Sequence, residues 1–225
     1  YSANPQIFTN GEGQYIFSKK KKYLDLSFSA GSLLLGHNSK IFKESIKSII
    51  KKKISNFAAP NSEAINFSKL LKKIFPLGEK FVFCNSGTEA VMKSLRICRA
   101  ISNKKLILLS TGSWHGSVEE CLYSPDKNLK LNPLSSGLHE KNIEKIKFIP
   151  YNQIEESKKT IEKYKKSINC IIVEPLQASL PNKESKKYLQ FLEKISKKYN
   201  ITLIFDEMIT GLRVDCLSLI HISEP

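Results

Sequence analysis

The chain has 225 residues, of which 41% are hydrophobic and 25% charged, and its formal net charge is +15. This mixture is too apolar for a disordered chain, and no apolar run approaches the ~18 residues that a membrane-spanning helix needs. Five widely spaced cysteines without a CxxC pair argue against a zinc site or a disulfide framework and favour reduced thiols in a cytoplasm. We expect neither a metal nor a membrane partner.

The positive charge comes almost entirely from lysine, because only Arg96, Arg99 and Arg213 among the 36 cationic residues are arginines. A surface that reads bases uses arginine for two-pronged contacts, so the composition argues against a sequence-specific nucleic-acid partner. The alternative to a nucleic-acid-binding surface is a lysine-rich composition that reflects an AT-rich genome. The abundant isoleucine, asparagine and serine agree with this alternative. Either interpretation predicts non-specific attraction to polyanions at low salt.

The first part of the chain predicts a small antiparallel structure followed by helices. We expect a turn at 11–13, followed by strands over 14–17 and 23–28 that flank a lysine-rich hairpin. Two amphipathic helices are expected over 41–54 and 62–75. Ser62 is a candidate N-cap of the second helix. Residues 1–61 are expected to form an N-terminal segment distinct from the rest of the chain.

From residue 80 onward, short apolar strands alternate with amphipathic helices, and a loop rich in Ser, Gly and Pro occupies 111–140. The expected strands cover 81–84, 106–109, 147–150, 170–173 and 201–205, and the expected helices cover 88–100, 154–166 and 188–199. This alternation predicts an α/β fold with a mostly parallel sheet and helices on both faces. In such a fold the chemistry collects beyond the carboxyl ends of the strands.

A first candidate site follows the strand expected at 81–84, where Ser86, Gly87 and Thr88 lead into a helix. Free backbone N–H groups and the helix dipole can bind an anion there. Gly87 lets a phosphate approach the backbone, and Thr88 adds a hydroxyl. The alternative is ordinary N-capping by Ser86 or Thr88. The P-loop pattern GxxxxGK[ST] is absent from the sequence.

Polar or aromatic residues also follow three other strands. Trp114, the only tryptophan, and His115 lie between glycines, and the indole can either stack on a planar ring or cap the core. Asp206 and Glu174 end two apolar strands, where a carboxylate without a partner costs free energy. Each carboxylate could instead cap the segment that follows it. Two such strand ends together with an anion site predict one shared pocket.

Together these segments resemble the class III aminotransferases, which are pyridoxal-phosphate enzymes of fold type I. Four stretches carry the resemblance in order and spacing: NSGTEA from residue 85, WHG from 114, IIVEP from 171 and IFDEMITGLR from 204. The long loop with SSGL from 135 and FIPYN from 148 is most similar to the glutamate-1-semialdehyde 2,1-aminomutase subgroup. Another class III aminotransferase, acting on a sugar precursor or an ω-amine, is the alternative.

The resemblance implies how these residues would hold pyridoxal 5′-phosphate. Ser86, Gly87 and Thr88 would hold the cofactor phosphate. Trp114 and Met208 would pack on opposite faces of the pyridine ring, at positions where the family usually has Tyr or Phe and Val.

Three further roles follow from the same resemblance. Asp206 would pair with the pyridine nitrogen and keep it protonated, which makes the ring an electron sink. His115 would lie beside the stacking residue, and Glu174 would sit in the pocket wall near the ring substituents.

The family's reactive residue is a lysine that forms a Schiff base with the cofactor and transfers protons, and no lysine follows Asp206 in this chain. The resemblance ends after Val214. We therefore expect residues 62–214 to be a partial cofactor-binding large domain, 215–225 to be a non-native tail, and the chain to be an inactive fragment. The full-length enzyme would be a cytoplasmic homodimer acting on a small amino or keto substrate.

Two other classes of function remain as competing hypotheses. A basic nucleic-acid-binding protein would bind polyanions tightly even at moderate salt. A short pseudoenzyme that uses this half-fold as a scaffold would have a gene that ends near Pro225.

Overall fold

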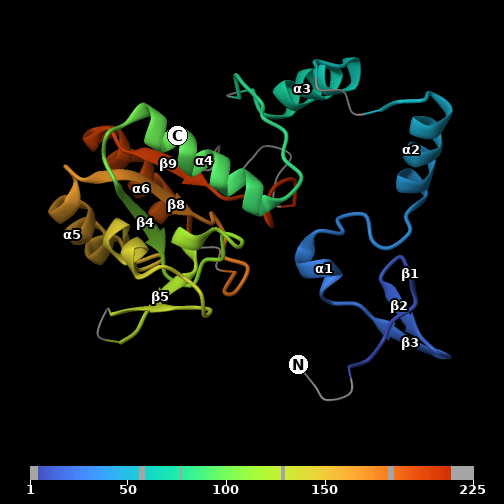
Figure 1. The fold of residues 1–225 in the computed structure, drawn as a ribbon, viewed down its shortest axis with the longest axis horizontal. Helices are drawn as coiled ribbons and strands as arrows, with labels where there is room; N and C mark the ends of the chain where they lie inside the picture. Colours follow the sequence, from blue (N-terminus) through green and yellow to red (C-terminus); the bar gives the residue numbers. More distant parts are fainter. Residues whose placement is uncertain (1–4, 56–58, 77, 128–129, 182–184, 214–225) are drawn as a thin grey trace. The chain divides into compact units, whose positions relative to one another are not determined.

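The computed structural model describes residues 5–55, 59–76, 78–127, 130–181 and 185–213, so the tail expected at 215–225 lies outside the described residues (Figure 1). The chain divides into two compact units, residues 1–69 and 70–225. Each unit has its own sheet, and the two are described in turn.

The first unit contains a three-stranded antiparallel sheet with the strand order β1-β2-β3. The turn expected at 11–13 is mostly strand, because Gly11 and Glu12 pair with Ile16 and Tyr15. The strand expected to run to residue 28 stops early, and a helical turn takes its place. The elements are β1 (Asn10–Glu12), β2 (Tyr15–Ser18), β3 (Lys21–Leu24), α1 (Phe28–Gly31) and α2 (Lys40–Lys51).

Helix α3 (Ser62–Ile74) crosses the division between the two units and matches the helix expected over 62–75. Its N-cap is Asn61 and not Ser62. The backbone N–H of Ala64 donates to Asn61 Oδ1 at 2.8 Å, which is the bond that an N-cap side chain makes to the third helical residue. Ser62 is already inside the first turn.

The second unit contains a parallel four-stranded sheet with the order β7-β4-β8-β9, and the expected α/β class is confirmed. A short antiparallel pair, β5 (Tyr123–Pro125) and β6 (Leu131–Pro133), lies within the region expected to be a loop. The parallel strands are β4 (Leu106–Ser110), β7 (Ile146–Ile149), β8 (Ile168–Val173) and β9 (Thr202–Phe205), and the helices are α4 (Gly87–Ile101), α5 (Ile154–Tyr164) and α6 (Ser185–Tyr199).

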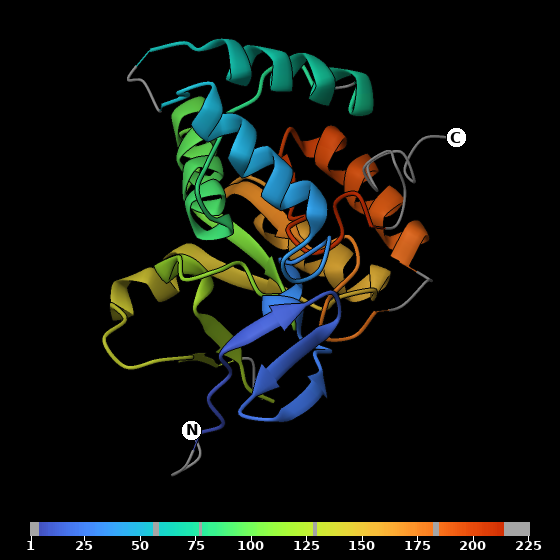
Figure 2. The same ribbon diagram turned by 90° about the vertical axis from the view of Figure 1, so that its right-hand side faces the viewer.

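Helices cover both faces of this sheet, as Figures 1 and 2 show. Side chains alternate along β4, so that Leu106 and Leu108 pack with α5 and α6, while Ile107 and Leu109 pack with α4. All six residues of β8 are buried. A strand buried on both faces reads as a continuous apolar run, which explains why the sequence pattern predicted β4 and β8 well.

The strand expected over 81–84 does not form. Val82 and Phe83 are 65% and 44% exposed, and within the described residues no strand pairs with this segment. An extended apolar segment becomes a strand only when a neighbour accepts and donates its backbone hydrogen bonds. The prediction of a strand at 81–84, made from the local pattern alone, is therefore wrong.

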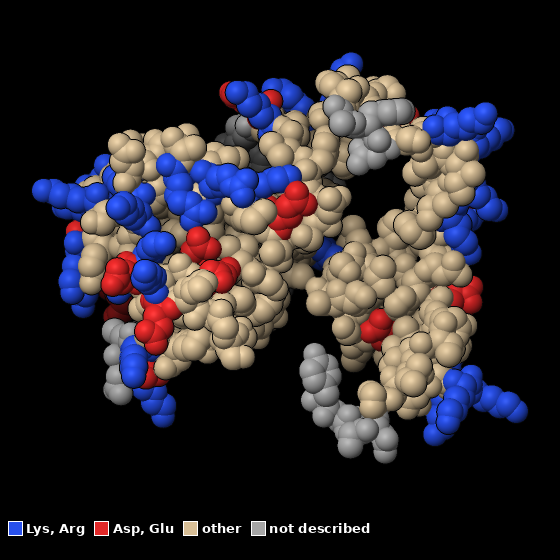
Figure 3. Space-filling view, viewed as in Figure 1, with Lys and Arg blue, Asp and Glu red and all other residues tan. Residues whose placement is uncertain are grey.

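Among the residues that the structure describes, no helix combines the length and the apolar content that a membrane crossing requires. On the face shown in Figure 3, lysine and arginine side chains are spread over several elements of each unit, with aspartate and glutamate between them. Positive charge is therefore scattered on that face and does not form one continuous surface.

Candidate functional site

The N-terminus of α4 presents unpaired backbone donors. Ser86 is its N-cap, and Ser86 Oγ accepts the backbone N–H of Glu89 at 3.1 Å. Within the described part of the chain, the backbone N–H groups of Gly87 and Thr88 have no acceptor. The capping interpretation of Ser86 is confirmed, and it is compatible with an anion site because the Ser86 hydroxyl keeps its own proton to donate.

Glu89 places a carboxylate in the first turn of α4, where it would repel an anion. Lys93 compensates, since its ammonium lies 2.7 Å from Glu89 Oε1. The hydrogen bond from Lys93, together with the backbone N–H of Asn85, lowers the pKa of Glu89. The helix start therefore carries little net negative charge.

The loop after β4 lies against this helix start. The backbone N–H of Ser117 donates to Thr88 Oγ1 at 3.1 Å. Gly116 has φ +74, and a Cβ on it would lie 2.4 Å from Thr88 Oγ1 and 3.0 Å from Thr88 Cα. Only glycine fits a position that combines a left-handed backbone with so close an approach.

A buried His–Asp pair joins the ends of β4 and β9. His115 Nδ1 lies 2.7 Å from Asp206 Oδ2, and the two residues are only 3% and 8% exposed. Because an ionised carboxylate only accepts hydrogen bonds, we assign the proton of this bond to Nδ1. Met208 N donates to the other oxygen, Oδ1, at 3.2 Å. Both oxygens of Asp206 are thus held by donors.

Two features of the surroundings bear on the chemistry of this pair. His115 Nε2 is buried and has no hydrogen-bond partner among the described residues, a situation that costs free energy unless a further polar group completes it. Burial, with smaller contributions from the Glu120 and Asp206 carboxylates, raises the pKa of the Cys121 thiol to about 12. Cys121 therefore stays protonated and contributes no charge.

Met208 connects the Asp206 strand end to the start of α4. A Cβ on Gly87 would lie 2.9 Å from Met208 Cγ and 3.0 Å from Met208 Cε, so the methionine side chain fills the space beside that glycine. Met208 is 54% exposed and Trp114 is 59% exposed. Two large apolar side chains are thus exposed beside buried polar groups.

Glu174, at the end of β8, binds backbone N–H groups through both carboxylate oxygens. Oε1 accepts from Trp114 N at 2.6 Å and Oε2 accepts from Ala178 N at 2.9 Å. Gln177, which the sequence reasoning missed, is 3% exposed and donates to the Thr111 carbonyl at 2.7 Å. The sequence did contain a signal for Gln177, because it is a polar residue three positions after Glu174, in the turn that follows a buried strand.

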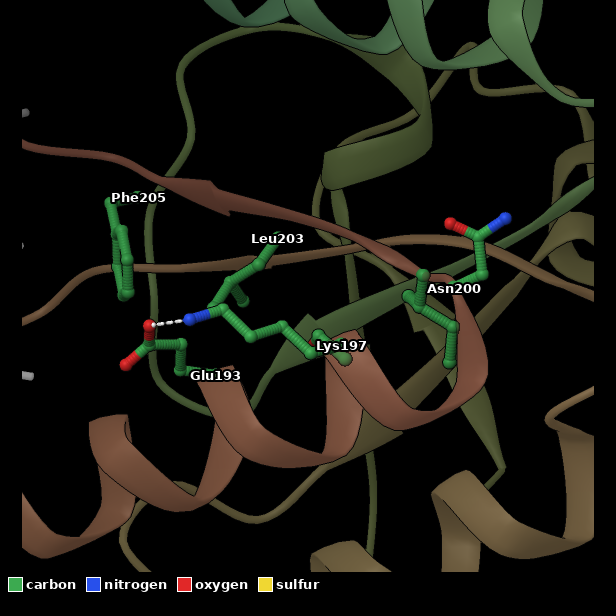
Figure 4. Close-up of a pocket in the computed structure, with 7 residues that line it drawn as sticks. Glu193, Lys197, Asn200, Leu203 and Phe205 are labelled. Carbon is green, nitrogen blue, oxygen red and sulfur yellow. Dashed lines mark hydrogen bonds and ion pairs between the residues drawn. The ribbon is translucent and has the colours of Figure 1, made fainter. Parts of the chain in front are cut away.

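The pocket drawn in Figure 4 is separate from this cluster. It has a volume of about 330 Å³ and lies between α6 and β9, where Glu193 and Lys197 form an ion pair at 2.5 Å (Figure 4). Leu203 and Phe205 form its apolar wall. None of the residues predicted to bind a cofactor lines this pocket, so we place the candidate site at the strand ends.

The structure brings all eight predicted residues into one connected cluster of the second unit. The Met208 side chain lies beside Gly87, and the Met208 backbone N–H donates to Asp206, which also binds His115. Glu174 accepts the backbone N–H of Trp114, the residue before His115. The cluster offers backbone N–H donors at a helix start, a buried carboxylate held by histidine, and exposed apolar side chains. Such a set suits a planar ligand that carries an anionic group and a protonated ring nitrogen.

Comparisons with known proteins identify relatives of this chain. A glutamate-1-semialdehyde 2,1-aminomutase from Thermodesulfovibrio yellowstonii is 34% identical over 218 residues, which cover 94% of this chain and 50% of that protein. The chain thus spans about half the length of the curated relatives that it matches.

Solved structures share the fold. An omega-transaminase from Sphaerobacter thermophilus matches with a TM-score of 0.86 and 27% identity over 96% of this chain and 51% of that one. A transaminase with PLP bound matches with a TM-score of 0.85 and 23% identity, over 96% and 51% of the two chains. A protein-family model described as Aminotransferase class-III matches residues 2–214. Since that match includes nearly the whole sequence, this chain belongs to the class III aminotransferase family.

Proposed function

We propose that the chain is part of a longer pyridoxal-phosphate-dependent enzyme of the glutamate-1-semialdehyde 2,1-aminomutase type, called the parent enzyme below. The observation that carries this proposal is the buried His115–Asp206 pair at the strand ends. Met208 connects this pair to a helix start whose first N–H groups have no acceptor in the described part of the chain. The identity to a curated aminomutase supports the same type.

The start of α4 fits the cofactor phosphate. The N–H groups of Gly87 and Thr88 have no acceptor among the described residues. Together with the positive end of the helix dipole they favour a dianion at this position. The hydroxyls of Ser86 and Thr88 accept backbone N–H bonds in the structure and retain their own protons for the phosphate oxygens. The ion pair of Glu89 with Lys93 offsets the repulsion between the Glu89 carboxylate and the cofactor phosphate.

Asp206 fits the pyridine nitrogen. Its carboxylate accepts from His115 and from Met208 N and retains lone pairs for one more donor. Pyridoxal phosphate, when bound, supplies an electron sink for the carbanion at the substrate Cα. Asp206 would hold the ring-nitrogen proton in place, and the Nδ1–H of His115 would keep the carboxylate oriented.

The exposed side chains of Trp114 and Met208 would contact the two faces of the cofactor ring. Aromatic stacking is worth roughly 0.5–1.5 kcal/mol beyond area burial, and methionine adapts to an aromatic surface through its polarizable thioether. Glu174, which accepts the backbone N–H of Trp114, would form the adjoining wall of the cofactor site.

The parent enzyme would contain a Schiff-base lysine beyond Asp206, where this chain has no lysine. We propose a homodimer in a reducing cytoplasm, consistent with the four described cysteines, which are all free thiols. Residues 62–214 would belong to its cofactor-binding domain, and 215–225 would be foreign to it. Without the lysine, the chain as printed would be inactive.

The substrate assay separates the two forms of the proposal. We expect the purified parent enzyme to isomerise glutamate 1-semialdehyde without any added keto acid, because both half-reactions of an aminomutase act on one substrate. An enzyme that turns over only when an ω-amine or sugar-precursor donor is paired with a keto acceptor would instead be a transaminase, the alternative supported by the 27% identity to the omega-transaminase. Lack of any amino-group transfer would contradict both.

A further inference from the structure

The turn after β8, residues 174–179, holds every residue of the segment 111–114. This segment carries Trp114 and directly follows β4. The bonds run from Gln177 Nε2 to Thr111 O (2.7 Å) and to Ser113 Oγ (2.8 Å), from Ser179 Oγ to Gly112 O (2.9 Å), and from Trp114 N to Glu174 Oε1 (2.6 Å).

The segment needs such support because its own sequence does not fix it. Gly112 and Gly116, on either side of Trp114, have φ +80 and +74, the left-handed region in which glycine is at ease and other residues are not. The Trp114 side chain is 59% exposed, so packing restrains it little. Hydrogen bonds therefore hold its backbone in place. Those from the 174–179 turn reach all four residues, and bonds at Thr111 and at His115 hold the two ends.

The two main supporting side chains match their partners in hydrogen-bond polarity. Glu174 only accepts, and both its oxygens face backbone N–H groups. Gln177 donates through its amide nitrogen to a carbonyl and a hydroxyl. Both side chains are buried, and within the described residues Glu174 has no ion-pair partner. An unpaired buried carboxylate is costly, so its use on two N–H groups indicates a specific demand for position.

We propose that Glu174 and Gln177 are positioning residues that hold the Trp114 indole where it covers the cofactor ring. They act through the backbone of residues 111–114. The inference rests on the proposed function, since the ring to be covered is that of the cofactor. It assigns Glu174 a task beyond forming the wall of the site and adds Gln177, for which the family resemblance implied no role.

Time-resolved fluorescence anisotropy of the 225-residue chain tests the inference, because Trp114 is its only tryptophan. Glu174→Gln turns one acceptor into a donor that faces a backbone N–H. Gln177→Glu turns the donor into an acceptor that faces the Thr111 carbonyl. We expect faster local depolarisation of Trp114 in both variants at unchanged far-UV circular dichroism. The matched controls are Glu155→Gln, in α5, and Gln153→Glu, at the residue that precedes it. Both residues are exposed, and both variants should leave the depolarisation unchanged.

Depolarisation equal to the unsubstituted chain in Glu174→Gln and Gln177→Glu would overturn the inference. If Glu174→Gln does not fold, Gln177→Glu and the milder Ser179→Ala carry the same test. A purely structural role would lower stability but would not loosen Trp114 in the folded chain.

Titration with pyridoxamine 5′-phosphate separates this inference from the proposed function. This amine cannot condense with the chain's many lysines, so quenching of Trp114 reports non-covalent binding. Saturable quenching in the unsubstituted chain, weakened in Glu174→Gln, supports both statements. Faster depolarisation without any quenching supports the positioning role and contradicts the cofactor site. Saturable quenching with equal depolarisation in all variants supports the site and overturns the positioning role.

Discussion

Replacing Asp206 with asparagine in the parent enzyme is expected to lower kcat on the order of 10²–10³-fold, the loss typical of removing one preorganised electrostatic group. A neutral amide cannot hold the ring nitrogen protonated, and it meets the Nδ1 proton of His115 with half the acceptor capacity of a carboxylate. The measurement is single-turnover kinetics at saturating cofactor, so that weakened cofactor binding does not contribute to the loss.

A second Asp–His pair in the chain provides the matched control. His37 Nε2 lies 2.7 Å from Asp25 Oδ2 in the first unit. The His37 hydrogen bond, with the backbone N–H groups of Phe28 and Ser27, lowers the pKa of Asp25. Asp25→Asn removes the same kind of bond at a residue outside the cluster, and we expect it to leave kcat unchanged. A wild-type kcat in Asp206→Asn would contradict the assigned role of Asp206.

Gly116→Ala is expected to destabilise the protein by about 2–5 kcal/mol, combining the cost of a left-handed alanine with that of overpacking. The added Cβ would lie 2.4 Å from Thr88 Oγ1 and 3.0 Å from Thr88 Cα, and the backbone atom cannot move without displacing the start of α4. The free energy of unfolding in urea, measured on the parent enzyme, gives the size of the effect.

Gly137→Ala separates the two contributions. Gly137 has φ +87, and nothing lies within 4 Å of the Cβ that alanine would add. We therefore expect Gly137→Ala to cost only the conformational part, about 1–2 kcal/mol. Equal destabilisation by the two substitutions would show that the contact between the loop and Thr88 contributes nothing.

Sequence patterns predicted the parallel sheet because its central strands are short, apolar and flanked by helices of clear periodicity. They failed where an element depends on a distant partner. Residues 81–84 have a strand-like sequence but pair with no described strand. The three-residue strands β5 and β6 form a sheet in which each pairs with the other. Asn61 and Ser62 are both residue types that can serve as an N-cap, so the sequence alone did not identify Asn61.

The candidate site was predictable as a set of residues but not as a network. Strand ends in a parallel sheet meet at one edge, so Glu174 and Asp206 could be expected to lie near Trp114. The bond between His115 and Asp206 joins residues 91 positions apart, and no local pattern indicates it. Gln177 was missed for the same reason, because its partners belong to a different strand end.

Peptide mapping of the borohydride-reduced parent enzyme, loaded with pyridoxal 5′-phosphate, tests the central claim most directly. Reduction fixes the cofactor to whichever lysine holds it. We expect one modified lysine, encoded after Val214, and no specific modification among the lysines of residues 1–213. A single reactive lysine within residues 1–213, or no specific modification anywhere, would contradict the claim that this chain belongs to an enzyme whose Schiff-base lysine lies beyond it.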